Sequence, residues 1–136
     1  MEFKTGNIRN VGVFGHSGSG KTTLVETMVF ESKGSQRRGS ITQQNTLSDY
    51  TNIEKEKEHS IFSTPLHAVW KSSKINIIDT PGYDDFIGEV LSTLKVIDTA
   101  IMTINAQNGI EVGTEIIWDY IQEYKKPTIF VINQMD

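Results

Sequence analysis

Residues 15–22, GHSGSGKT, suit phosphate chemistry because they match the pattern G-x-x-x-x-G-K-[ST]. In such a loop, backbone N–H groups surround nucleotide phosphates, the lysine contacts the outer phosphates and the hydroxyl reaches magnesium. A glycine-rich turn before an ordinary helix is the alternative. The stretch at 8–14 reads as a strand, however, and apolar residues at helical spacing follow the loop, as a phosphate site requires. The predicted contacts are Gly15, His16, Ser17, Gly18, Ser19, Gly20, Lys21, Thr22 and Thr23.

A second group of candidate residues follows the apolar strand predicted at 74–79. Asp79 ends this strand, and Gly82 lies three residues further on in the sequence DTPG. A carboxylate in this position can hold the magnesium shell, and the glycine N–H can approach the γ-phosphate of a nucleotide. DTPG is also an ordinary turn sequence, but its place after an apolar strand favours the nucleotide role. We therefore expect Thr22 and Asp79 at the metal and Gly82 at the phosphate.

The third group is NQMD at 133–136, after the strand predicted at 128–132. A carboxylate there can accept protons from N1 and N2 of guanine, whereas adenine offers no matching donors. Asn133, Gln134 and Asp136 are therefore predicted to contact the base, and the ligands are GTP or GDP with Mg²⁺. A small-molecule kinase with the same phosphate loop is disfavoured, because it has no need of this motif.

The elements that must position these residues alternate along the chain. Strands are predicted at the five ranges 8–14, 62–70, 74–79, 99–105 and 128–132, the second and third forming an antiparallel hairpin. A first helix is expected at 21–32, ended by a left-handed Gly34, with others after Phe86 and after Gly109. This order predicts an α/β fold of the P-loop NTPase class: a mostly parallel, doubly wound sheet with helices on both faces. Trp70 and Trp118 are expected in the core.

Composition narrows the class of protein. The 136 residues have room for one domain, and the formal net charge of −4 does not suggest a basic face for nucleic acid. The absence of cysteine suits a reducing cytosol. No apolar run is long enough to span a bilayer, and the first residues, MEFK, do not open a signal peptide. We expect a cytoplasmic chain without a membrane partner or sequence-specific nucleic-acid contacts.

With these motifs in place, the sequence resembles the nucleotide-binding domain of a translational GTPase, above all of elongation factor G and its paralogues. Further matching segments are NTLSDY at 45–50 and GIEVGTE at 109–115. The resemblance implies ribosome-stimulated GTP hydrolysis coupled to translocation, with the ribosome as partner of the full-length protein. It also implies that the polar stretch near 36–64 is switch I, that 79–90 is switch II, and that 1–136 is the N-terminal part of the GTP-binding domain.

Four positions depart from the family's pattern. A gap-free count places the switch I magnesium hydroxyl on Ser60, with Ser63 or Thr64 as alternatives. Tyr83 stands at the position of the catalytic histidine, and because tyrosine neither titrates like imidazole nor reaches the same point, we expect weak or absent hydrolysis. A non-hydrolysing, nucleotide-dependent ribosome-binding factor is therefore the alternative function. Gln134 replaces a lysine, and Gly18 replaces an aspartate.

The resemblance also implies that parts of the domain lie beyond 136: a sixth strand, a helix and a loop that covers the base. A sheet truncated after its fifth strand would leave 128–132 as a bare edge. We then expect reduced nucleotide affinity, and pairing between copies or a domain swap through that edge.

Overall fold

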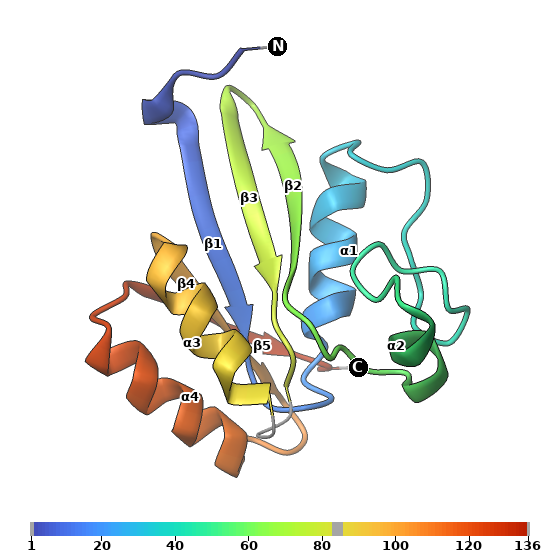
Figure 1. The fold of residues 1–136 in the computed structure, drawn as a ribbon, viewed down its shortest axis with the longest axis vertical. Coiled ribbons are helices and arrows are strands. Elements are labelled where there is room, and N and C mark those ends of the chain that lie inside the picture. The colour runs from blue at the N-terminus through green and yellow to red at the C-terminus, as the bar shows by residue number, and fades with distance from the viewer. Residues whose placement is uncertain (1, 83–85, 136) are drawn as a thin grey trace.

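Five strands form one sheet in the computed structural model, which describes residues 2–82 and 86–135. The strand order is β2-β3-β1-β4-β5, and all neighbours are parallel except β2 and β3 (Figure 1). The bounds are β1 (Ile8–Phe14), β2 (Thr64–Trp70), β3 (Ser73–Asp79), β4 (Thr99–Asn105) and β5 (Thr128–Asn133). The predicted α/β fold with a mostly parallel sheet is confirmed.

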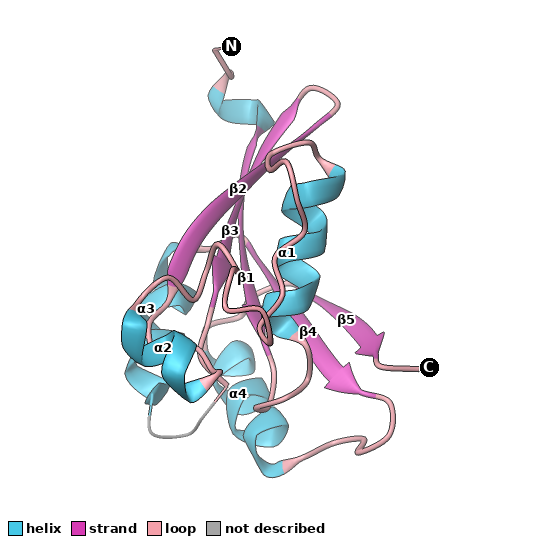
Figure 2. Ribbon diagram, turned by 90° about the vertical axis from the view of Figure 1, so that its right-hand side faces the viewer, coloured by secondary structure: helices cyan, strands magenta, loops and turns pink. Residues whose placement is uncertain are grey.

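Helices cover both faces of the sheet, as predicted (Figures 1 and 2). Helix α1 (Lys21–Glu31) packs on one face through Val25 and Val29, which join Val13, Ala68, Ile77 and Ile101 in a buried cluster. Helices α3 (Ile87–Val96) and α4 (Val112–Glu123) cover the other face, where the second buried cluster is Phe14, Val90, Leu94, Ile97, Ala100, Met102, Ile117 and Ile121. The two cores thus lie on opposite faces of the sheet, against the strands whose carboxyl ends carry the predicted motifs.

A short helix, α2 (Asn52–Lys57), lies in the polar segment for which the sequence predicts no regular structure. Its N-terminus is a capping box, in which the Thr51 hydroxyl accepts from the Glu54 N–H and the Glu54 carboxylate accepts from the Thr51 N–H. Apolar periodicity could not reveal this helix, because its six residues are too few to show a repeating apolar face.

Several predicted details are wrong. Helix α1 ends at Glu31, and the left-handed residue after it is Lys33, with φ 60°, rather than Gly34. Strand β2 begins at Thr64 instead of residue 62. Trp70 ends an outer strand and is 56% exposed, so it is not a core residue. Trp118 is half-buried and packs against Phe130, with 5.2 Å between ring centroids.

Strand β5 forms the edge of the sheet opposite β2, and its Ile129, Phe130 and Ile132 are about half exposed. Pairing through this edge stays a prediction. Among the described residues, no helix has both the length and the apolar character needed to cross a bilayer.

Helix α3 offers a matched test of the core, because Leu94 is fully buried and Val96 is 58% exposed. We expect Leu94→Ala to lower the free energy of unfolding by about 2–5 kcal/mol through lost burial and the cavity it leaves. Val96→Ala should change it by less than about 0.5 kcal/mol. Urea denaturation followed by circular dichroism measures both, and equal losses would contradict the packing described.

Candidate nucleotide-binding site

The phosphate loop connects the end of β1 to the start of α1, between Phe14 and Lys21. Gly15 and Gly20 have φ of 147° and 84°, a region that side chains disfavour. A Cβ at Gly15 would also overlap Thr103, and one at Gly20 would overlap the Asn133 amide. The chain therefore needs glycine at both ends of the loop for β4 and β5 to pack closely against it.

Lys21 is 6% exposed, and its Nζ donates a hydrogen bond of 2.9 Å to the carbonyl oxygen of His16, within the loop. Burial lowers the pKa of Lys21 to about 8, although the charges of Asp79 and Asp49 act in the opposite direction. The ammonium thus lies inside the loop without a salt bridge among the described residues. A phosphate placed in the loop would provide the opposite charge that this group lacks.

Three segments contribute oxygen atoms beside the loop. The Thr22 hydroxyl donates to Asp79 Oδ2 at 2.8 Å and lies 3.3 Å from Ser60 Oγ, and Ser60 Oγ donates to Asp49 Oδ1 at 2.6 Å. Asp79 Oδ1 is buried without a hydrogen-bond partner in the described structure. Burial raises the pKa of Asp79 to about 6. Hydroxyl and carboxylate oxygens around an unpartnered carboxylate oxygen fit the ligand preference of Mg²⁺.

The three hydroxyls that the sequence offers for the metal lie in different places. Ser60 Oγ is the one beside Thr22. Ser63 Oγ lies 3.5 Å from the Glu89 carbonyl oxygen, and Thr64 Oγ1 donates to the Ser48 carbonyl oxygen at 3.0 Å. The sequence reasoning missed Asp49 as a site residue, because its contact with Ser60 depends on how the polar segment folds back.

Gly82 faces the phosphate loop. A Cβ added there would overlap Lys21 Nζ and lie 2.8 Å from the Ser17 backbone nitrogen. The space between β3 and the loop therefore depends on the absence of a side chain. Tyr83, the residue expected at the catalytic position, lies outside the described residues.

The end of β5 contacts the phosphate loop from the opposite side. Asn133 Nδ2 donates to the Ser19 carbonyl oxygen at 3.0 Å, and Gln134 Nε2 donates to the Gly18 carbonyl oxygen at 2.8 Å. Gln134 Oε1 accepts from the Asn105 amide at the end of β4. The Gln134 side chain thus braces the loop, although the sequence suggests that it covers part of the base. Asn105 has no sequence signal beyond its place at a strand end, and Asp136 lies outside the described residues.

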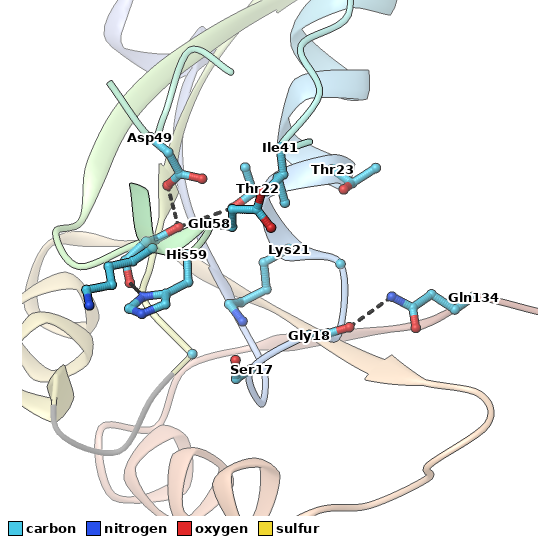
Figure 3. A pocket seen from close by; sticks show the side chains of 14 residues that line it. Ser17, Gly18, Lys21, Thr22, Thr23, Ile41, Asp49, Glu58, His59 and Gln134 are labelled. Atoms are coloured by element: carbon cyan, nitrogen blue, oxygen red, sulfur yellow. Dashed lines mark hydrogen bonds between the residues drawn. The ribbon is translucent and has the colours of Figure 1, made fainter. Parts of the chain in front are cut away.

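A cavity of about 330 Å³ is lined by residues from each of these segments, among them Lys21, Asp49, Ser60, Gly82 and Gln134. Figure 3 shows Gln134 and Gly18 on one side of it, Asp49, Glu58 and His59 on the other, and Lys21 between them. Thr23 lines the cavity with an exposed side chain. His16 lies in the loop with Nε2 3.6 Å from Glu111 Oε1. The arrangement can therefore hold a polyanion with a divalent cation.

Asp79 gives the ligand-free chain a pH dependence. Because its folded-state pKa of about 6 exceeds the ordinary 3.8, folding favours the protonated form, and stability falls as the pH rises from about 4 to about 6. We expect Asp79→Asn to raise the free energy of unfolding at pH 7 by about 1–3 kcal/mol, and to have no such effect near pH 3.5. Urea titrations at both pH values test this, with the exposed Asp119→Asn as control. An equal gain at both pH values would contradict it.

The family model for the elongation factor Tu GTP binding domain matches residues 6–136. "Ribosome-releasing factor 2, mitochondrial" of Meyerozyma guilliermondii is 39% identical over 96% of this chain and 16% of its own length. "Elongation factor G 2" of Borreliella burgdorferi is 37% identical over 96% of the chain and 19% of its own. Tetracycline resistance protein TetM from transposon Tn1545 of Enterococcus faecalis is 39% identical over 95% of this chain and 20% of its own length.

Among solved structures, a protein of Thermus thermophilus superposes with a TM-score of 0.92 and 32% identity, over 95% of this chain and 20% of that one. Elongation factor SelB of Methanococcus maripaludis, solved with the GTP analogue GPPNHP, shares the fold with a TM-score of 0.71 at 24% identity. The match covers 97% of this chain and 22% of that protein. The chain thus spans a fifth or less of the curated relatives named above. It belongs to the elongation factor Tu GTP-binding-domain family of translational GTPases.

Proposed function

We propose that the chain is the GTP-binding module of an elongation factor G-like translation factor. The observation that carries the proposal is the convergence of three separate segments at the carboxyl ends of parallel strands. Lys21 and Thr22 come from the phosphate loop, Asp79 from β3 and Asn133 from β5. In this sheet topology ligands bind at that end, where the α1 N-terminus also favours an anion.

Each segment has a separate task in the proposed site. Lys21 and the loop N–H groups neutralise the phosphates, and Gly82 offers its N–H at the γ-phosphate. Thr22 and Ser60 would hold Mg²⁺ directly, with Asp79 in its shell and Asp49 accepting a hydrogen bond from Ser60. When bound, the ion neutralises charge on the phosphate oxygens. Asp136 would read guanine, while Asn133 and Gln134 keep the loop in place.

The partner proposed for the whole protein is the ribosome. It rests on the names of relatives, which include an elongation factor G, a ribosome-releasing factor and a tetracycline resistance protein. We propose that the full-length protein acts in translocation or in ribosome release, in the cytoplasm. The absence of cysteine is compatible with that compartment.

Hydrolysis is the step that this chain is proposed to perform poorly. In phosphoryl transfer, water positioning and charge compensation supply most of the rate. Tyr83 has a phenol where the family has an imidazole, so it can neither carry the same proton nor place its polar atom at the same distance from the backbone. The alternative is a factor that uses bound nucleotide without turnover, and Tyr83 is the observation in its favour.

Nucleotide choice tests the proposed binding function. We expect GTP and GDP to displace a fluorescent GDP derivative at concentrations at least about a hundredfold lower than ATP, since only guanine has donors for Asp136. Lys21→Ala should abolish binding in the same titration, because it removes the buried cation of the loop. Equal competition by ATP and GTP would reject the guanine-reading module and favour a kinase.

Replacing the tyrosine tests the proposed weakness in hydrolysis. We expect Tyr83→His to raise ribosome-stimulated phosphate release, under single-turnover conditions in the full-length protein, by at least about tenfold through restored water positioning. Tyr124→His, at the end of α4 remote from the phosphate loop, should leave the rate unchanged. Release by the unmodified protein at the rate of an ordinary elongation factor would refute weak hydrolysis. No release from either protein would favour the non-hydrolysing alternative.

A further inference from the structure

Two glutamates, Glu26 in α1 and Glu54 in α2, are fully buried without a salt bridge among the described residues. An uncompensated buried carboxylate is costly unless hydrogen bonds satisfy its oxygens. Both instead accept hydrogen bonds from backbone N–H groups of the segment between α1 and β2. Neither glutamate has a part in the nucleotide contacts described above, so their burial calls for another explanation.

Glu26 ties α1 to both ends of the loop at 39–48. Its Oε2 accepts from the Gly39 N–H at 3.1 Å, and its Oε1 accepts from the N–H groups of Leu47 at 2.5 Å and Ser48 at 3.3 Å. A Cβ at Gly39 would overlap Oε2, so the chain needs glycine for this close approach. The last anchored residue, Ser48, directly precedes Asp49.

Glu54 closes the second loop, at 51–62, in the same manner. Its Oε2 accepts from the Thr51 N–H at 3.2 Å and the Thr51 hydroxyl at 2.6 Å, while Oε1 accepts from Ile61 N at 3.1 Å and Phe62 N at 3.2 Å. Burial acts to raise the pKa of Glu54, but the hydrogen bonds lower it below its usual value, which favours the carboxylate. The first residue anchored at the far end, Ile61, directly follows Ser60.

The two anchored residues, Ser48 and Ile61, are therefore each next to a residue whose side chain lies at the candidate magnesium site, Asp49 and Ser60. The two side chains meet, since Ser60 Oγ donates to Asp49 Oδ1 at 2.6 Å. We propose that Glu26 and Glu54 are positioning residues, which hold the backbone so that Asp49 and Ser60 face Thr22. The proposal rests on the proposed nucleotide and magnesium function, and it assigns to α1 a second role besides carrying Lys21 and Thr22.

Glutamine is the informative replacement, because it keeps the size of the side chain but presents an NH₂ group in place of one acceptor oxygen. In either variant at least one backbone N–H would then face another donor inside the structure, which is an expensive arrangement. The matched controls are Glu31→Gln on α1 and Glu56→Gln on α2, whose side chains are exposed. Glu26→Asp, which keeps the charge but withdraws the oxygens, replaces Glu26→Gln should that variant fail to fold.

The experiment measures the affinity of the full chain for a fluorescent, non-hydrolysable GTP analogue, once in Mg²⁺ and once in EDTA, because the γ-phosphate orders this segment together with the ion. We expect both Gln variants to match the unmodified chain in EDTA within about threefold, since the phosphate loop is untouched. The gain in affinity on adding Mg²⁺ should shrink by at least about fivefold. Amide hydrogen exchange should accelerate at Leu47 and Ser48 in Glu26→Gln, and at Ile61 and Phe62 in Glu54→Gln. The control variants should change neither readout.

Other results separate this inference from the proposed function. A chain that binds the GTP analogue, with Gln variants that keep the full increase in affinity on adding Mg²⁺, would overturn the positioning role alone. Equal losses in Mg²⁺ and in EDTA would also overturn it, because they would indicate general support of the fold. If the affinity of the unmodified chain does not increase on adding Mg²⁺, the positioning role is refuted and nucleotide binding still stands. Failure of the unmodified chain to bind the GTP analogue at all would refute the proposed function, and the positioning role with it.

Discussion

The burial of one ammonium and two carboxylates in the same small region is the constraint on which the rest of the structure depends. Lys21, Asp49 and Asp79 are all at least nine-tenths buried, and in the described part of the chain no two of them form a salt bridge. The cost appears in the pKa of Lys21, lowered to about 8, and of Asp79, raised to about 6, with desolvation as the main cause of both shifts. Bound phosphates and a divalent cation would offset this cost by supplying opposite charges.

The fold places these charges by bringing together segments that are far apart in the sequence. Strands β1, β3, β4 and β5 run parallel, so the phosphate loop, Asp79, Asn105 and Asn133 all lie at one end of the sheet. The two cores pack against the two faces of the sheet. The segment between α1 and β2 adds no described residue to either core and is attached by the carboxylates of Glu26 and Glu54. Because this attachment consists of a few hydrogen bonds, it can open locally without loss of the core.

The sequence predicts those features that depend on local pattern. The bounds of β1 and β4 agree with the prediction to the residue, since β1 leads directly into the glycine-rich loop and β4 is mostly apolar up to the turn that follows it. The strand pattern around Trp70 predicts a core position, but a strand pattern alone does not show whether the strand lies in the centre or at the edge of the sheet. Asn105 escapes prediction because Gln134 lies 29 residues away. Glu26 and Glu54 escape it because they accept mainly from backbone N–H groups, up to 22 residues away, and such groups leave no trace in residue type.

The most direct measurement is a crystal structure of the chain with Mg²⁺ and a non-hydrolysable GTP analogue. We predict the triphosphate within the loop of residues 15–22, Lys21 Nζ on its outer phosphates, and the ion between Thr22 and Ser60 with Asp79 in its shell. The guanine should lie beside Asn133 and Asp136. A nucleotide bound elsewhere on the surface, or an ion that none of these oxygens approaches, would contradict the account.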